Sequence, residues 1–512
     1  MIFNQLFLWH DICTYTNERF PKNRRTGYTQ TDNQNMRFKS IIVMLLSAVT
    51  AAAQSDTLTL TLSEAILTAC KQSSDAKAAH HTLLAAEWSY KFYKANYLPA
   101  ISLTSSPGLN HVTSKVTQPD GSSLFVEQNQ LSTDASLSVT QNIALTGGQF
   151  FVRSTLQRQD ELKNNTTAYG STPVVVGYQQ SLFGYNSLKW DRRIEPLRYQ
   201  QAKKEYKESM ELIASRTASY FFTLASAQTE LYIAEYNYAS ADTLSRYARG
   251  RYNIGTITES EMLQLELNKI TAEANLLNAR SYLEDAMQSV RSYLAIDGSC
   301  IIKVVIDETV PPYKADVAEA LKLAHENSPD PTSYELRRRQ SESNLAYAKA
   351  DAGLKAELYV QFGLSQTADN LRDSYRSPQN RQYASIGITL PLLDWGRGKG
   401  KVKVAESNVD LVETQIEQAY KDFEINVGKM VRQFNLQAHR VEVAAKSATL
   451  AQQRYDVARR MYILGKSTIL DFNAATSEKD AARRSHISAL QTYWQLYYGL
   501  RSITGGKIFG NL

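Results

Sequence analysis

The chain has 512 residues, of which 57 are Lys or Arg and 51 are Asp or Glu, so its formal net charge is +6. That balance is too mild to indicate a nucleic-acid partner. Gly (23) and Pro (12) lie below the roughly 7% and 5% usual in proteins, which predicts long uninterrupted elements. Three cysteines without a CxxC pair exclude a disulfide framework and a zinc-ligand spacing. No apolar run reaches the length of about 18 residues that a membrane-spanning helix needs, so a membrane role would fall to strands.

The amino terminus has the order of a secretory signal peptide. Arg37 and Lys39 precede an apolar run over 41–49, and three alanines ending at Ala53 follow it. We therefore expect a signal peptide at 36–53, cleaved after Ala53, and an upstream extension at 1–35 from a misplaced start codon. The stretch before Cys70 superficially resembles a lipoprotein box, but it lies inside an amphipathic helix, so we interpret Cys70 as a packed side chain.

The rest of the chain contains a tandem duplication. Thr61-x-x-Glu64 is a capping-box pattern at a helix start, and Asp316-x-x-Glu319 repeats it 255 residues later. The second helix of each half runs to about Tyr97 or Ala352, after which the apolar period changes from helical to alternating. The predicted organisation is a first repeat at 54–300 (helices 61–97, strands within 99–183, hairpin 190–296), a connector at 301–315, a second repeat at 316–505 (helices 316–352, strands within 356–393, hairpin 399–503) and a tail at 506–512.

The predicted strands have one apolar and one polar face. Leu358, Val360, Phe362 and Leu364, for example, alternate with smaller or polar residues. At least four strands are expected (about 99–107, 134–146, 356–366 and 383–393), and a further pair near 149–160 and 173–183 stays open, as does a loop or added hairpin over 110–172. Strands of about 10 residues with this pattern can cross an outer membrane.

The longest helices, about 190–250 and 399–461, would each span about 90 Å. Their apolar positions keep a heptad, which indicates coiled-coil packing, at Tyr220, Leu224, Ala227, Leu231, Ala234, Tyr238 and Ala241 and again at Val427, Val431, Phe434, Ala438, Val441, Ala445 and Ala448. Each helix ends at a glycine, and a heptad helix returns. His486 falls on a returning seam, where we expect a buried histidine with a satisfied hydrogen bond. One chain has too few strands to close a barrel, so we expect it to oligomerise.

The chain resembles the TolC-type outer-membrane efflux protein family over residues 58–505. The resemblance rests on Glu64-Ala65 and Glu319-Ala320, Tyr97-Leu98-Pro99, Thr146-Gly147-Gly148 and Asp394-Trp395-Gly396, and most specifically on Arg251-Tyr252-Asn253-Ile254-Gly255 and Met461-Tyr462-Ile463-Leu464-Gly465. It implies an α+β membrane protein and a homotrimer. Tandem-duplicated coiled-coil helices would form a periplasmic tunnel, and strands would share one outer-membrane barrel, of twelve strands in the family.

The resemblance also implies roles for individual residues. Gly255 and Gly465 would lie in the tips that meet a periplasmic adaptor, although an ordinary helical hairpin would also use glycine there. Asp471 would line the narrow entrance, and Tyr462 and Glu261 match links that hold it closed. Two family residues are absent, since Ser467 replaces an arginine and Ala474 replaces a second aspartate.

The function expected is passive export through an outer-membrane channel that works with an adaptor and an inner-membrane pump and extends into the periplasm of a Gram-negative cell. The alternatives are a duct for type I protein secretion and, in a different class, a structural or adhesive trimeric coiled coil. The sequence contains no Ser-His-Asp or Cys-His set and no P-loop, so no enzyme activity, cofactor or metal site is expected.

Overall fold

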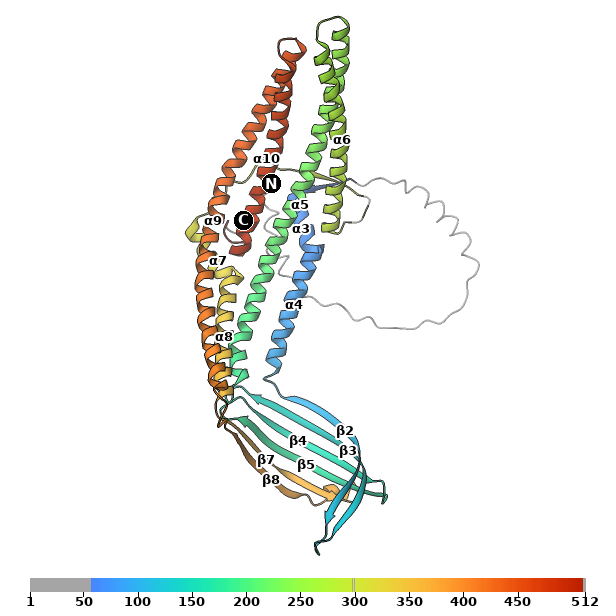
Figure 1. Cartoon of the computed structure of the whole chain (residues 1–512), viewed down its shortest axis with the longest axis vertical. Helices are drawn as coiled ribbons and strands as arrows, with labels where there is room; N and C mark the ends of the chain where they lie inside the picture. The colour runs from blue at the N-terminus through green and yellow to red at the C-terminus, as the bar shows by residue number, and fades with distance from the viewer. Residues whose placement is uncertain (1–56, 297, 299, 510–512) are drawn as a thin grey trace, which may run out of the picture. The chain divides into compact units, whose positions relative to one another are not determined.

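The computed structural model describes residues 57–509 except Asp297 and Ser299, so the predicted signal peptide, the upstream extension and Cys13 lie outside the described residues. In chain order the elements are β1 (Thr57–Thr61), α3 (Leu62–Gln72), α4 (Ser74–Ala95), β2 (Ala100–Thr117), β3 (Ser123–Ile143), β4 (Gly148–Glu161), β5 (Thr166–Ser181), α5 (Ser187–Asn253), α6 (Glu259–Leu294), β6 (Ile301–Val305), α7 (Val317–Asn327), α8 (Pro329–Ala352), β7 (Lys355–Ala368), η2 (Asp373–Tyr375), β8 (Gln379–Thr389), α9 (Arg397–Ile463) and α10 (Ile469–Thr504) (Figure 1).

The duplication is visible in the helix lengths. Helices α5 and α9 both have 67 residues, and α6 and α10 both have 36. The short helices α3 and α7 both have 11 residues. Thr61 and Glu64 form the predicted capping box reciprocally, whereas Asp316 supplies the side-chain bond to the amide of Glu319. The same local start signals therefore produce the same elements in both halves.

The described chain divides into two compact units, and helices α5 and α9 contribute to both. The helical unit contains the described residues of 1–81, 204–328 and 424–512. Its α5 and α10 are joined by Arg484, whose guanidinium donates twice to Glu230 at 2.7 Å, and by Arg501, which donates twice to the buried Glu211. The heptad seams predicted on its helices are buried or half-buried throughout.

A small parallel sheet in the helical unit was not predicted from the sequence. Strand β1 pairs with β6, which lies in the segment expected to be a simple connector. Ile302 and Val304 of β6 are buried, and Gln228 of α5 fastens the strand by donating to the carbonyl of Ile302 and accepting from the amide of Val304. Five residues with two inward side chains are too short a pattern to separate from an extended linker.

The second unit, 82–203 and 329–423, contains a six-stranded sheet in the order β2-β3-β4-β5-β7-β8. Every neighbouring pair is antiparallel. The segment 110–172, open between a loop and an added hairpin from sequence alone, consists mostly of strand. Gly147, with φ of +77°, turns β3 into β4, so Thr146-Gly147-Gly148 marks a strand-to-strand turn rather than the end of the sheet.

Helix α8, most of α4 and the adjoining parts of α5 and α9 complete this second unit. Arg338 of α8 donates twice to Glu413 of α9, both at 2.9 Å, and the rings of Tyr90 and Tyr199 stack at 4.7 Å between α4 and α5. Among the described residues, no helix has both the length and the apolar character needed to cross a membrane.

Candidate functional site

The two turns that connect α5 to α6 and α9 to α10 are the sites of the predicted tip glycines. Gly255 has φ of +73° and Gly465 has φ of +72°. In each turn the glycine amide donates three residues back, to Tyr252 or Tyr462, and the following amide donates five residues back. This pair of bonds is a Schellman motif, which requires a left-handed residue at the glycine position. The predicted positive φ is confirmed at both tips.

The returning helices begin with matched caps. The Thr258 hydroxyl accepts from the amide of Glu261, whose carboxylate accepts from the Thr258 amide at 3.0 Å and hydroxyl at 3.1 Å. At the equivalent position the Thr468 hydroxyl accepts from the amide of Asp471 and donates to its carboxylate at 2.8 Å. Glu261 and Asp471 are therefore the same position of the duplicated hairpin, and both cap helix starts.

Asp471 is exposed, and the hydroxyl of Ser467 also donates to its carboxylate, at 3.3 Å. Hydrogen bonds that the carboxylate accepts from the side chain and the backbone amide of Thr468 lower the pKa of Asp471 below its ordinary value, so within one chain this carboxylate is ionised at neutral pH. In the single chain Asp471 makes the contacts of a helix cap. The ring of three carboxylates stays a proposal.

Tyr462 packs beneath the second tip. Its ring stacks on Phe472 with centroids 5.6 Å apart. Tyr462 packs against a buried cluster to which both hairpins contribute: Leu244, Ala248, Leu265, Tyr455, Ile469 and Phe472. Burial raises the pKa of Tyr462; the charge of Arg251 opposes this shift and that of Glu261 adds to it. The structure thus brings Tyr462 and Glu261, singled out from sequence, into one electrostatic neighbourhood.

Arg251 also belongs to this neighbourhood, although the sequence predicted no separate role for it. One guanidinium nitrogen lies 3.7 Å from where a Cβ would sit on Gly465, so the first hairpin reaches the tip of the second. The equivalent residue of the second hairpin is Met461. The difference between Arg251 and Met461 could have identified Arg251 from the sequence. When two copies of a duplicated motif differ in charge at one position, that charge is a candidate for a role in one copy only.

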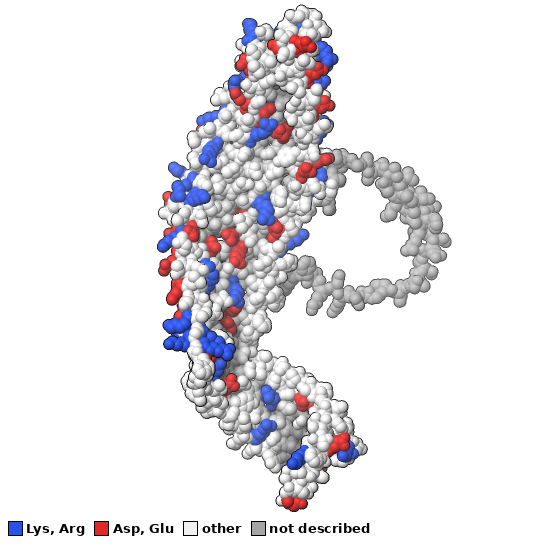
Figure 2. All heavy atoms as spheres, viewed as in Figure 1, with Lys and Arg blue, Asp and Glu red and all other residues white. Residues whose placement is uncertain are grey.

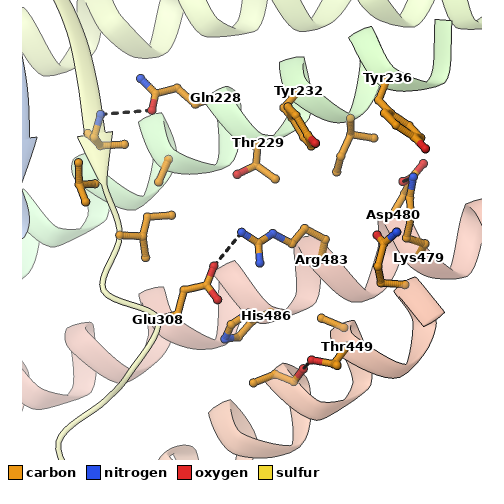
Figure 3. A pocket seen from close by; sticks show the side chains of 18 of the residues that line it. Gln228, Thr229, Tyr232, Tyr236, Glu308, Thr449, Lys479, Asp480, Arg483 and His486 are labelled. Atoms are coloured by element: carbon orange, nitrogen blue, oxygen red, sulfur yellow. Dashed lines mark hydrogen bonds and ion pairs between the residues drawn. The ribbon is translucent and has the colours of Figure 1, made fainter. Parts of the chain in front are cut away.

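A polar groove of about 890 Å³ lies farther along the hairpins, between α5, α9, α10 and the segment after β6 (Figure 3). Lys479 contacts the Asp480 carboxylate at 3.1 Å and lies over the ring of Tyr455 at 4.3 Å. Asn237 of α5 donates to Asp480 at 2.7 Å. Glu308 and Arg483 pair at 2.8 Å across the groove. Lys479 and Asp480 are buried, whereas Arg483 and Glu308 are about half exposed. The bond from Asn237 joins α10 to α5, and the pair of Arg483 with Glu308 joins α10 to the segment after β6.

His486 lines the same groove and is only 2% exposed. The prediction of a buried seam histidine is confirmed, but the expected satisfied hydrogen bond is wrong for one nitrogen. Within the described part of the chain, Nε2 has no hydrogen-bond partner. Burial lowers the pKa of His486; the charge of Glu308 opposes this shift and that of Arg483 reinforces it. The ring is therefore held neutral.

We next asked whether charges or metal-binding groups gather elsewhere on the described residues. On the face shown in Figure 2, acidic and basic side chains are interspersed along the helices. Over the residues that the structure describes, no group of three or more His, Cys, Asp or Glu side chains is arranged to hold a metal ion. The two tips are the candidate site because they bring together the positive-φ glycines, the caps Glu261 and Asp471, and exposed apolar side chains.

Comparison with known proteins gives two kinds of result. The sequence profile of a family described as outer membrane efflux protein matches residues 65–295 and 320–506. A curated relative, the toxin and drug export protein A of Aggregatibacter actinomycetemcomitans, is 22% identical over 120 residues, which are 23% of this chain and 26% of the relative. The match thus spans about a quarter of that relative's length.

Solved outer-membrane proteins share the fold. The CmeC outer membrane channel of Campylobacter jejuni is 14% identical with a TM-score of 0.63, covering 88% of this chain and 86% of that one. The outer membrane protein VceC of Vibrio cholerae is 15% identical with a TM-score of 0.59, covering 87% and 96%. At these identities the likeness concerns the fold, in which long helices accompany a sheet.

Proposed function

The chain belongs to the outer membrane efflux protein family and is an outer-membrane channel protein, and from that premise we propose that it is the exit duct of a tripartite efflux system. In this system a homotrimer joins an inner-membrane pump, through a periplasmic adaptor, to the exterior. Flow through the duct is passive, and the pump supplies the energy. The observation that carries the proposal is the incomplete sheet, whose six strands cannot close around a pore within one chain.

An exposed apolar stripe on α9 supports assembly of several copies. Its members recur every seven residues and are each about half exposed or more: Leu436, Val443, Leu450 and Val457 on the helix, and Leu464 directly after its end. This stripe lies opposite the seam that packs within the chain. A heptad of apolar side chains is the surface that a further helix covers in a coiled coil. A second copy of the chain supplies such a helix.

The tips support docking of an adaptor. Ile254 and Leu464 immediately precede the two tip glycines and are 74% and 66% exposed. Apolar side chains held out on rigid Schellman turns are suited to insertion between helices of a partner. Gly255 and Gly465 would then serve as adaptor-docking positions, and Asp471, Tyr462 and Glu261 as the periplasmic entrance.

Two other functions differ from the efflux duct in what the protein would carry or bind. One relative is named for the export of both toxin and drugs, so a secretion duct is the second candidate. A structural or adhesive trimer is the third, and the duplicated strands argue against it because a stalk has no use for them.

Deletion of the gene in its native cell separates the three functions. An efflux duct predicts that the deletion strain accumulates a fluorescent efflux substrate and that re-expression of the wild-type chain restores export. Unchanged accumulation together with loss of a secreted protein would favour the secretion duct. Unchanged accumulation and secretion with a loss of surface adhesion would contradict both duct functions.

A further inference from the structure

The six-stranded sheet has two strands with one unpaired edge each, β2 and β8. We propose that residues 100–110 of β2 pair with β8 (Gln379–Thr389) of a second copy, so that three chains close one barrel of eighteen strands. This inference rests on the trimer of the proposed function and adds to it the number of strands and the register of the closing pair.

The six-stranded sheet has one largely apolar face and one more polar face, as the wall of a membrane barrel requires. A row of apolar side chains crosses five of them in register: Ile101, Val139, Val152, Val176 and Phe362. The next row on the other face is more polar: it contains Ser102, Ser138, Arg153 and Arg381, with Val175 and Gly363 between the two arginines. Ile386 and Ile388 of β8 continue the apolar face and are more than 60% exposed. The added pair β4 and β5 lies in the middle of this continuous face, so it belongs to the wall.

The two edges run in directions that allow them to meet. Five successive antiparallel pairings separate β2 from β8, so the two strands are antiparallel to each other. Copies related by a rotation axis therefore present β2 to β8 as an antiparallel pair. In lipid an unpaired strand edge is costly because nothing there can hydrogen-bond the free amides and carbonyls. Closure by further copies removes both edges at once.

The lengths of the two edges also match. Strand β8 has 11 residues. Strand β2 has 18, but the pairing of β3 with β4 stops at Gln130, which lies opposite Asn110 of β2. The part of β2 that is level with the sheet is therefore 100–110, which also has 11 residues. Beyond Asn110, β2 and β3 continue as a two-stranded hairpin that β4 does not accompany (Figure 1).

Alternation of side chains and the matched strand lengths together set the register of the seam. The apolar Ile101 and Leu103 of β2 must share a face with Ile386 and Ile388 of β8. Aligned strand ends satisfy this condition and place Ile101 opposite Ile388 and Ser102 opposite Gly387. A slip by one residue would put every apolar side chain of one strand on the polar face.

The consequence is a wider exit. Barrel diameter grows roughly linearly with strand number, so eighteen strands give about one and a half times the diameter of twelve. Barrels of about 16–18 strands enclose an aqueous channel. The added β4–β5 hairpin thus enlarges the outer-membrane opening.

Cysteine pairs test the seam in the full chain, with Cys13, Cys70 and Cys300 replaced by serine. Ser102→Cys combined with Gly387→Cys should give disulfide-linked dimers and trimers on mild oxidation, because directly opposed residues lie within disulfide range. The control Ser102→Cys with Ser385→Cys shifts one partner by two residues, to about 7–8 Å, and should cross-link at least about tenfold more slowly. Ser102 and Gly387 are both exposed, and a Cβ at Gly387 meets no atom within 4 Å.

The competing arrangement has four strands per chain, with β2 and β3 outside the barrel and β4 at the seam. It predicts cross-links from Gln149→Cys, Phe151→Cys or Arg153→Cys to Gly387→Cys, and any of these as the dominant product would overturn the proposal. Absence of the Ser102–Gly387 link in a protein that sediments as a trimer and conducts ions would also overturn it while leaving the duct function intact. A protein that neither assembles nor conducts would instead refute the duct function.

Discussion

At the scale of single residues, the tips show how backbone geometry, rather than a side chain, defines a site. Gly255 and Gly465 hold left-handed conformations, and a Cβ added at either would meet no close obstacle. Any cost of substitution there comes from the positive φ, about 1–2 kcal/mol, and from altering the docking surface.

Gly255→Leu or Gly465→Leu should therefore leave the trimer intact but abolish export in cells. Sedimentation in detergent and substrate accumulation measure the two effects. Gly250→Leu is the matched control, because Gly250 lies in helix α5 with open space around it and needs no positive φ. Normal export by both tip variants would show that the partner docks elsewhere.

Asp471 carries the prediction about ion selectivity. Its capped, ionised carboxylate would be repeated three times around the axis of a trimer, and such a ring attracts cations. Asp471→Asn should lower the cation preference of the channel, read as the reversal potential in asymmetric salt. Thr468→Ala removes the cap and keeps the charge, so it should retain the preference. Wild-type selectivity in Asp471→Asn would place this residue away from the constriction.

His486 gives the fold a dependence on pH. Its pKa is lowered in the folded chain, so below the ordinary value of about 6.5 the unfolded chain binds the proton more readily. Stability contributed by the neutral ring is present above that pH and is lost as the pH falls. Denaturant unfolding at pH 7.5 and 5.5 should show a larger loss for the wild-type chain than for His486→Gln. Equal losses would mean that His486 is not the group responsible.

At the scale of elements, the predictions that succeeded rest on long periodic patterns. Helical stretches of about 60 residues, each with a heptad in its middle and a glycine at its end, placed α5 and α9 within a few residues of their ends. The repeated offsets located their returning helices. The features that the sequence did not predict are short elements and contacts between residues far apart in the chain. The pairing of β1 with β6 joins segments more than 200 residues apart, and Arg251 reaches Gly465 only because two hairpins lie together. Local sequence does not encode such contacts.

The exposed stripe of α9 should be the surface that assembly covers. Val443→Lys combined with Leu450→Lys places two ammonium groups on the stripe and should raise the dissociation constant of the trimer at least about tenfold, because a buried unpaired charge is costly. Helical content by circular dichroism should not change. Gln453→Lys, which adds charge on the flank of the same helix, is the control. A trimer unaffected by the double substitution would assign the stripe to some other partner.

At the scale of the whole molecule, the helices and the sheet of one chain each leave a surface that another copy of the chain can cover. Its helices leave an apolar stripe exposed, and its sheet leaves two edges unpaired. The sequence predicted the long helices, the alternating strands and the need to oligomerise. It left open the number of strands, because a hairpin and a long polar loop have similar composition until their pairing is known.

The central claim is that this chain forms a conducting pore, and single-channel recording in a planar bilayer tests it most directly. The purified, assembled protein should insert and give discrete, uniform conductance steps, with a preference for cations that depends on Asp471. Protein that floats with liposomes, and is therefore membrane-bound, but gives no conductance steps at any voltage or pH would contradict the account.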